Sequence, residues 1–318
     1  MIMCRQQISQ QLCSKQSSVR NYNKGNKMNR SKQSLSIGKL LFAVVISIIT
    51  CNKVYAATIL YGVTGDGATD PESLFSLDQT DGTKTSLVTL GNGDDGEAIA
   101  YNPNDGLIYH WSGWFDNVFE SIDPDDGYSV TEIGVGGDWV NVKSATYNPS
   151  TSGFLLADGQ TYFYSVSEFG DGEYLGDVVD GNTNIKGLAF VDSTLYGLLA
   201  NASVGENELL VINPDTGGVL NSIDITMVGY DVYGGTGLAT NPETGELWAL
   251  IKVVGVTNPV LATIDLDTGV ASYIGDPGDK FAGITFAQLS PVPLPPALVL
   301  FASGLIGLMV VTRKNIQR

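Results

Sequence analysis

Seven carboxylates in the middle of this sequence lie in irregular, glycine-rich stretches and are the first candidates for chemistry. They are Asp94, Asp95, Glu97, Asp138, Asp180, Asp231 and Asp279. Clustered carboxylate oxygens suit Ca²⁺, which takes about six to eight oxygen ligands. The same residues suit a solvated acidic rim, since Asp and Glu are mostly exposed in folded proteins. Both interpretations stay open, and Ca²⁺ is the cofactor that the sequence suggests.

Large aromatic residues occur in the same stretches, namely Trp114, Phe115, Trp139, Tyr230 and Tyr233. Rings beside carboxylates suit stacking on sugars, and they equally suit packing between sheets. We include Trp114, Trp139 and Tyr230 with the seven carboxylates in the predicted ligand-binding set. Tyr109, Trp111 and Trp248 lie within apolar strand patterns, so we expect them in the core.

The sequence offers no recognisable catalytic constellation. His110 is the only histidine, it lies in a predicted strand, and no GxSxG-type nucleophile motif is near it. We therefore assign no catalytic residue and favour a binding protein over an enzyme. Paired carboxylates that hydrolyse a glycosidic bond remain the enzymatic alternative, because their separation is a matter of geometry.

A repeated inner segment positions these residues. Five segments align, and their last residues are 46, 43, 50 and 46 positions apart: Ala98 to Tyr101, Ser144 to Tyr147, Gly187 to Phe190, Gly237 to Thr240 and Gly283 to Phe286. This period is typical of a four-stranded propeller blade. Two aligned positions are small in every copy, as crowded strands round a narrow axis require.

Turn motifs divide each repeat into four short strands. NPNDG at 102 to 106 and NPETG at 241 to 245 follow the first strand, and VINPDTG at 211 to 217 ends the third. Pro fixes φ, Gly accepts positive φ, and Asn or Asp bonds its own backbone. The alternative, a β-sandwich with fortuitous spacing, lacks a reason for this period.

The first repeat lacks its first strand, and the last repeat consists of a first strand only. Residues 59 to 90 and 283 to 286 therefore complete one blade together, which removes exposed sheet edges. We predict an all-β, five-bladed β-propeller over residues 57 to 289. The long loops emerge at one face, where we expect the ligand-binding set.

Charge and cysteine distribution exclude several classes of protein. All 34 acidic residues lie between residues 57 and 290, and subtracting the five lysines there gives that segment a formal charge of −29. Such a field repels phosphate backbones, so we predict no nucleic-acid partner. Cys4, Cys13 and Cys51 all precede this segment, which leaves it without a thiolate metal site, a cysteine nucleophile or a disulfide.

The amino-terminal 56 residues read as a secretory signal with an extended basic region. A basic flank, an apolar run from Leu40 to Ile49 and a Val-Tyr-Ala stop precede Ala57, the expected first mature residue. Met28 gives a signal of more ordinary length and is our candidate for the true start. Cys51 raises the alternative of a lipoprotein site, although Thr50 before it fits poorly.

Residues 290 to 318 form a separate terminal segment. Val292, Pro293, Leu294 and Pro295 precede an apolar run at 297 to 311, which ends at Arg313 and Lys314. This predicts a short transmembrane helix with the basic residues in the cytoplasm and the acidic segment outside.

The order of motif, helix and basic stop resembles the PEP-CTERM sorting signal of Gram-negative bacteria, in its Val-Pro-Leu-Pro variant. The resemblance implies an exosortase that cuts near the proline motif and passes the protein to the cell surface. It also implies a membrane-anchored intermediate and a host that makes exopolysaccharide.

These features together predict an exported, surface-sorted propeller that binds a polysaccharide or matrix component, or is purely structural. The alternative function is an extracellular hydrolase or lyase that uses carboxylates on the long-loop face. The expected partners are the secretion machinery, the exosortase and exopolysaccharide.

Overall fold

The computed structural model describes residues 57 to 91, 93, 97 to 113, 117 to 134, 141 to 159, 162 to 178, 184 to 199 and 207 to 290. All regular structure in these residues is β-strand. They contain no helix of the length and hydropathy needed to cross a bilayer. The predicted signal peptide, the Val-Pro-Leu-Pro motif and the predicted transmembrane helix lie outside the described residues.

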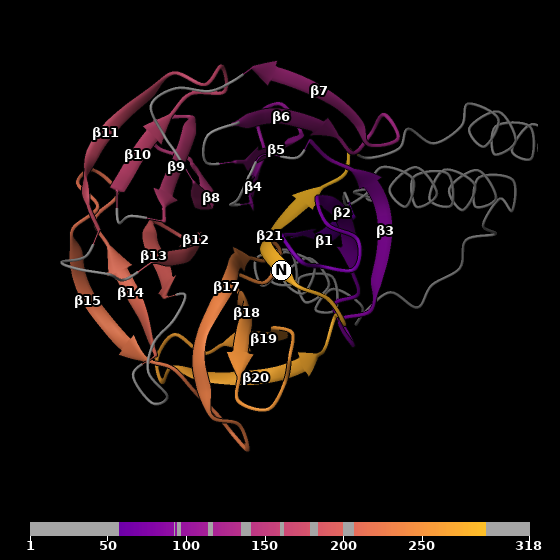
Figure 1. Ribbon diagram of the computed structural model, residues 1–318. Coiled ribbons are helices and arrows are strands. Elements are labelled where there is room, and N and C mark those ends of the chain that lie inside the picture. Colours follow the sequence, from indigo (N-terminus) through magenta and orange to yellow (C-terminus); the bar gives the residue numbers. More distant parts are fainter. Residues whose placement is uncertain are drawn as a thin grey trace, which may run out of the picture. The chain divides into compact units, whose positions relative to one another are not determined.

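Five sheets stand in a ring, each with one strand at the centre and one at the periphery (Figure 1). The inner strands are β4 (Glu97–Asn102), β8 (Val142–Asn148), β12 (Ile185–Val191), β17 (Val232–Thr240) and β21 (Phe281–Gln288). The second strands are β1 (Thr58–Thr64), β5 (Leu107–Ser112), β9 (Gly153–Asp158), β13 (Thr194–Leu199) and β18 (Leu247–Val253). The third strands are β2 (Ser73–Leu77), β6 (Val118–Asp123), β10 (Tyr162–Val166), β14 (Glu208–Ile212) and β19 (Val260–Ile264). The outer strands are β3 (Lys84–Thr89), β7 (Ser129–Gly134), β11 (Gly172–Asp177), β15 (Val219–Asp224) and β20 (Val270–Gly275).

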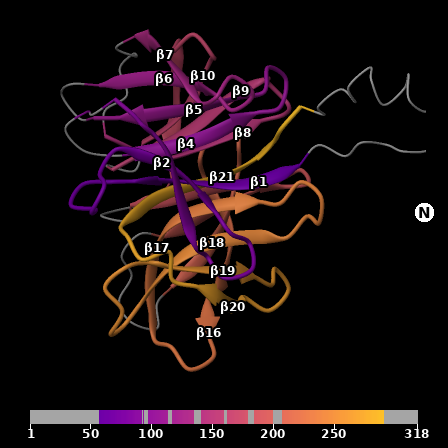
Figure 2. The same cartoon turned by 90° about the vertical axis from the view of Figure 1, so that its right-hand side faces the viewer.

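Each inner strand contacts the inner strands of the two neighbouring sheets, in the cyclic order β21, β4, β8, β12 and β17. The described residues therefore form a five-bladed β-propeller, as the repeats predict. Seen from the side, the strands cross the thickness of the ring (Figure 2). We call the end of the axis where the inner strands begin the mouth end, and the end where they finish the turn end.

The ring closes by pairing of the first and last described strands. β21 lies between β4 and β1, and it pairs antiparallel with β1 so that Leu60 faces Phe286 and Gly62 faces Ile284. The amide of Leu289 extends this contact by donating to the carbonyl of Ala57 at 3.0 Å. The prediction that both ends of the repeat region share one blade is confirmed. The closure completes the fifth sheet, in the order β21, β1, β2 and β3.

The core is divided among the five boundaries between blades. Each of five apolar clusters combines residues of two adjacent blades. Between the blades of β5 and β9, for example, Trp111 packs edge-on against Phe154 with ring centroids 5.0 Å apart. Tyr109, Trp111 and Trp248 are at most 5% exposed, which confirms them as core residues. No disulfide is needed when each blade buries both of its faces.

The small residues of the inner strands permit this close packing. A Cβ added to Gly187 would lie 2.7 Å from the Cβ of Leu238 on the next inner strand. A Cβ at Gly237 would lie 3.0 Å from the backbone nitrogen of Ile284. A side chain at Gly187 would force its neighbours to shift, and one at Gly237 would make a tighter contact than side chains ordinarily make, so glycine suits both positions.

The turns between strands use the predicted side-chain bonds. At 102 to 106 the amide of Asn104 donates to Oδ1 of Asn102 at 3.0 Å, and Gly106 adopts a φ of +82°. At 241 to 245 the amide of Glu243 donates to Oδ1 of Asn241 at 2.9 Å. Asn thus fixes the start of the turn and Gly its end.

Two details differ from the sequence prediction. Tyr230, Asp231 and Tyr233 are expected in an irregular loop, but Tyr233 belongs to β17, which two register shifts bend along β18. The connection before β17 also adds a fifth strand to the last blade: β16 (Thr226–Met227) pairs parallel with the outer strand β20. The linking chain crosses the outer edge of this blade and satisfies its exposed backbone groups there.

Candidate functional site

A pocket of about 360 Å³ opens at the mouth end of the axis. One residue from each blade, immediately before the repeated inner segment, lines it: Glu97, Lys143, Lys186, Thr236 and Ala282. These residues occupy equivalent positions in the five repeats, so the pocket is centred on the propeller axis. We call it the axial pocket.

Residues beyond the inner ring complete the axial pocket. Asp66 follows β1, Lys252 lies on β18 opposite Gly234, and Lys280 immediately precedes β21. Tyr233 and Thr257 add a ring and a second hydroxyl. All five blades therefore contribute to one lining that mixes amines, carboxylates, hydroxyls and an aromatic ring.

The Thr236 hydroxyl is a buried polar atom with no hydrogen-bond partner among the described residues. Its residue is 7% exposed and lies in the lining of the axial pocket. Buried hydroxyls in native proteins are nearly always satisfied by protein, water or ligand. This hydroxyl is therefore available to a group that enters the pocket.

Glu97 joins the axial pocket to a buried polar cluster between two blades. It is 4% exposed, and the Ser112 hydroxyl donates to its Oε1 at 3.4 Å. Burial raises the pKa of Glu97, and the nearby Asp66 carboxylate raises it further, while His110, a hydrogen bond with Glu72 and Lys143 oppose the shift. The buried position thus favours a proton on this carboxyl group.

Glu72 of the same cluster has an unusual backbone conformation. It is buried and has a φ of 49°, in the left-handed region that a non-glycine residue seldom adopts. Its carbonyl accepts a hydrogen bond from the Leu90 amide at 2.7 Å, which holds the segment before β2 against the chain after β3. Such local strain is maintained only where surrounding contacts fix it.

His110 is buried and forms a hydrogen bond with a neighbouring glutamate. Its ring is fully buried, and Nδ1 lies 2.9 Å from Oε1 of Glu120. Burial tends to raise the pKa of Glu120, but the hydrogen bond with His110 outweighs this and lowers it, aided by the amide of Gly91. His110 is not among the residues that line the axial pocket.

The lysines of the axial pocket differ in exposure. Lys280 is exposed, Lys186 and Lys252 are half-buried, and Lys143 is 8% exposed. Burial lowers the pKa of Lys252, because an ammonium group loses hydration in the pocket wall.

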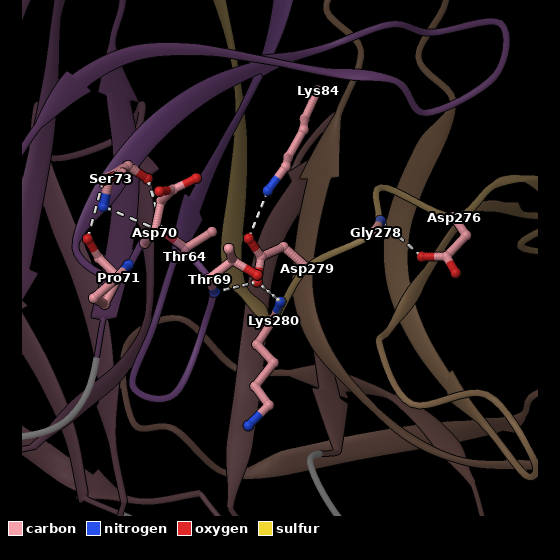
Figure 3. A network of polar contacts seen from close by, with 10 residues as sticks. All are labelled: Thr64, Thr69, Asp70, Pro71, Ser73, Lys84, Asp276, Gly278, Asp279 and Lys280. Atoms are coloured by element: carbon pink, nitrogen blue, oxygen red, sulfur yellow. Dashed lines mark hydrogen bonds and ion pairs between the residues drawn. The ribbon is translucent and has the colours of Figure 1, made fainter.

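Asp279, one of the predicted ligand residues, holds two loops together. Its Oδ2 lies 2.5 Å from Nζ of Lys84, and its Oδ1 accepts the amides of Thr69 at 2.8 Å and Lys280 at 2.9 Å. Figure 3 shows Lys84 reaching this carboxylate while the Lys280 side chain extends in the opposite direction. Burial raises the pKa of Asp279, but these donors outweigh it and lower the pKa. Asp279 is 3% exposed, so it supports the rim of the pocket from behind.

Two other predicted ligand residues lie away from the axial pocket. Tyr230 stacks on Tyr273 of the outer strand β20, with ring centroids 5.7 Å apart. Asp231 is exposed, and its carbonyl accepts the amide of Val254 at 2.9 Å. Of the predicted set, the structure brings Glu97 into the pocket and places Asp279 behind its rim.

The remaining predicted ligand residues are not among those the structure describes. They are Asp94, Asp95, Trp114, Asp138, Trp139 and Asp180. Within the described ranges, no three His, Cys, Asp or Glu side chains are grouped to hold a metal ion. The calcium site stays a prediction that rests on the other carboxylates.

Sequence reasoning missed the lysines of the axial pocket. Lys143 and Lys186 directly precede the aligned inner segments that begin at Ser144 and Gly187. Lysine is rare in this acidic segment, yet it occurs twice at the same position of the repeat. This recurrence could have predicted that the two lysines lie side by side around the propeller axis.

The turn end of the axis holds a second pocket, of about 320 Å³. Its lining is mostly apolar and repeats an inner-strand aromatic or threonine followed by the proline of the turn, as in Tyr101 with Pro103 and Tyr147 with Pro149. Between the two pockets, the inner strands leave a space of only about 10 Å³ on the axis, roughly enough for one water molecule. The two pockets are therefore separate.

Fold and site together define a five-bladed β-propeller with a polar pocket at one end of its axis. The chain matches no protein-family model and no curated protein.

Among solved structures it is similar to a GH43 glycoside hydrolase engineered to display endo-xylanase and exo-arabinofuranosidase activity, with a TM-score of 0.50 and 10% identity over 77% of this chain and 58% of the hydrolase. A Bacteroides caccae protein of unknown function gives a TM-score of 0.46 and 11% identity over 73% of this chain and 99% of that one. Kuenenia stuttgartiensis hydrazine synthase gives a TM-score of 0.39 and 14% identity over 61% of this chain and 57% of the synthase. The chain thus spans less than two thirds of the hydrolase and of the synthase, and identities this low show the fold alone.

Proposed function

We propose that this chain is an exported protein, sorted to the cell surface, whose propeller binds a saccharide in the axial pocket without transforming it. The observation that carries the proposal is the pocket itself. Its volume of about 360 Å³ falls within the range of small-ligand sites, and all five blades line it. Side chains on a closed ring of strands are held rigidly, which limits the entropy lost on binding.

The chemistry of the lining favours a ligand with many hydroxyl groups. The Thr236 hydroxyl is buried without a partner among the described residues, and Thr257 supplies a second hydroxyl. Tyr233 offers a ring with a polar tip, which suits the mixed apolar and polar faces of a sugar. Carboxylates and amines complete the set of acceptors and donors.

A binding assay tests this part of the proposal. The full chain, purified in mild detergent, is applied to a glycan array and to the same glycans in solution, with and without Ca²⁺. We expect binding to a subset of saccharides with no new reducing ends, and weaker binding by Thr236→Val. A complete absence of saccharide binding would favour a purely structural surface protein instead.

The proposal of surface sorting rests on the two terminal segments. Residues 39 to 57 have the pattern of a secretory signal, and residues 292 to 314 resemble an exosortase substrate. Mass spectrometry of the protein released from the cell surface is expected to find a start near Ala57 and an end near the proline motif. Recovery of residues 297 to 318 on the surface form would contradict exosortase processing.

A hydrolase is the second candidate, favoured by one observation. Asp66 and Glu97 line the same pocket, and burial raises the pKa of Glu97, as expected of a general acid in glycoside hydrolysis. Turnover of a bound glycan that is abolished by Glu97→Gln and by Asp66→Asn would establish this function. Tight binding without turnover would exclude it for that glycan.

A further inference from the structure

Lysine is rare in the propeller and concentrated in one place. Between residues 57 and 290 the sequence has five lysines and no arginine. Four of the five, Lys143, Lys186, Lys252 and Lys280, line the axial pocket. The fifth, Lys84, pairs with Asp279 behind the rim. If five lysines were placed at random over five blades, four of them would not be expected to line one pocket.

The four lysines approach the pocket from four different blades. Lys143 and Lys186 stand at equivalent positions on β8 and β12, Lys252 lies near the end of β18, and Lys280 precedes β21. The Lys280 side chain extends away from the Lys84 and Asp279 pair (Figure 3). The amines thus surround one space and do not form a stripe along a single strand.

The described lining of the axial pocket has a charge opposite in sign to that of the segment around it. Four amines face two carboxylates, those of Asp66 and Glu97, among the described residues that line the pocket. Burial favours the neutral form of Glu97, which shifts the balance further toward positive. Three of these lysines also interact with other groups of the protein, so the inference rests on this net balance. The surrounding segment has a formal charge of −29, from 34 acids less five lysines.

Keeping amines in a partly buried pocket has an energetic cost. Burial lowers the pKa of Lys252, and Lys143 is only 8% exposed. Like charges gathered in a recess also repel one another, and the low dielectric of the walls strengthens that repulsion. An anion that enters the recess relieves both costs, and the walls focus the field on it.

We propose that the axial pocket selects saccharides that carry an anionic group, a uronate carboxylate or a sulfate ester, and that Lys143, Lys186, Lys252 and Lys280 bind this group. The inference rests on the proposed function, because it specifies the ligand of the same site. The amines bind the anion, while the Thr236 hydroxyl and Tyr233 contact the sugar. The acidic exterior repels the same ligand elsewhere, so binding is confined to the mouth end.

The test compares ligands that differ only in charge. The full chain in mild detergent is titrated into three labelled oligosaccharides, and fluorescence anisotropy is recorded: tri-galacturonate, its fully methyl-esterified form and a sulfated trisaccharide. We expect at least one of the two charged ligands to bind at least about tenfold more tightly than the ester, with affinity that falls as NaCl is raised. Whether the carboxylate or the sulfate binds identifies the source of the charge.

Variants locate the binding group. Lys186→Gln and Lys280→Gln are each expected to weaken binding of the charged ligand by about five- to tenfold and to leave the ester unaffected. Glu132→Gln, which changes one charge on the exposed outer strand β7, is the control outside the pocket, and we expect it to bind like the parent protein. Thermal unfolding verifies that each variant is folded at the assay temperature, and the comparison of ligands on the parent protein does not depend on any variant.

The outcomes separate the two proposals. If no saccharide binds, charged or neutral, the proposed function fails. If the ester binds as tightly as the charged ligands, or if the pocket variants bind like Glu132→Gln, the binding function stands and the charge inference is wrong. If free sulfate displaces the labelled sulfated trisaccharide as well as the unlabelled trisaccharide does at the same concentration, the sugar adds nothing to binding and the assignment to a saccharide is wrong.

Discussion

Replacing Asp279 by Asn tests whether one buried carboxylate holds the rim of the axial pocket. Asp279 connects residues that are distant in the sequence, since Lys84 lies 195 positions away. Asn keeps an oxygen for the amides of Thr69 and Lys280 but loses the charge that Lys84 contacts at 2.5 Å. The substitution therefore removes the ion pair while it preserves the shape of the site.

The magnitude follows from the burial of the pair. Hydrogen bonds to charged groups contribute about 1.5–3 kcal/mol each, and breaking a buried pair from one side costs about 3–5 kcal/mol. The Lys84 side chain is 24% exposed and regains water, which places the loss at the lower end, about 2–3 kcal/mol. For a domain of this size the expected fall in Tm is about 5–10 °C.

Thermal unfolding followed by circular dichroism at neutral pH measures this loss. The pKa of Asp279 is lowered in the folded protein, so its contribution is present above the unfolded pKa and is lost as pH falls through the folded one. The gap in Tm between the parent protein and Asp279→Asn should therefore narrow in acid. A double-mutant cycle with Lys84→Met isolates the pairwise interaction.

Two results would refute the reasoning about Asp279. One is a Tm for Asp279→Asn within about 1 °C of the parent at neutral pH, which is far below the fall expected from the pair. The other is additivity of the Asp279 and Lys84 substitutions, which would mean that the short contact contributes nothing beyond its separate parts.

Three further predictions concern packing, closure and protonation. Gly187→Val should lower the free energy of unfolding by at least about 1–3 kcal/mol in urea, because its side chain would meet Leu238 on the next inner strand; Gly218→Ala, whose Cβ would have 3.4 Å to its nearest neighbour, is the control and should change little. Deleting Phe281–Gln288 should abolish cooperative unfolding and expose the chain to protease, whereas a cooperative transition would show that closure is dispensable. Burial raises the pKa of Glu97, so the native state holds its proton above the unfolded pKa and stability falls as pH rises through the raised value. Glu97→Gln should therefore gain stability relative to the parent as pH rises above the unfolded pKa of glutamate, about 4.3, and a difference that does not change with pH would contradict this.

The sequence was sufficient for the fold because the determinants of the fold repeat. A small residue at each inner-strand position, as at Gly187 and Gly237, recurs at the blade period and reports the crowding at the axis. The closure by β1 and β21 followed from counting strands, because one blade was missing its first strand and another had only that strand.

The site was harder to predict because its determinants do not repeat. The five residues before the inner segments differ in charge and size, so the alignment that revealed the blades concealed the ring formed by Lys143, Lys186 and their counterparts. The burial of Asp279 depends on Lys84 and Thr69, which are distant in the chain. The sequence therefore predicts Asp279 as a ligand-binding residue, whereas its carboxylate binds Lys84 and the Thr69 amide within the protein.

The pairing of β1 with β21 also fixes where the described propeller begins and ends. Thr58 faces Gln288 in this pair, and both lie at the turn end, opposite the axial pocket. The described propeller thus begins and ends at the turn end, away from the lysines of the axial pocket. A ligand that approaches the axial pocket therefore does not pass the residues at which the described propeller begins and ends.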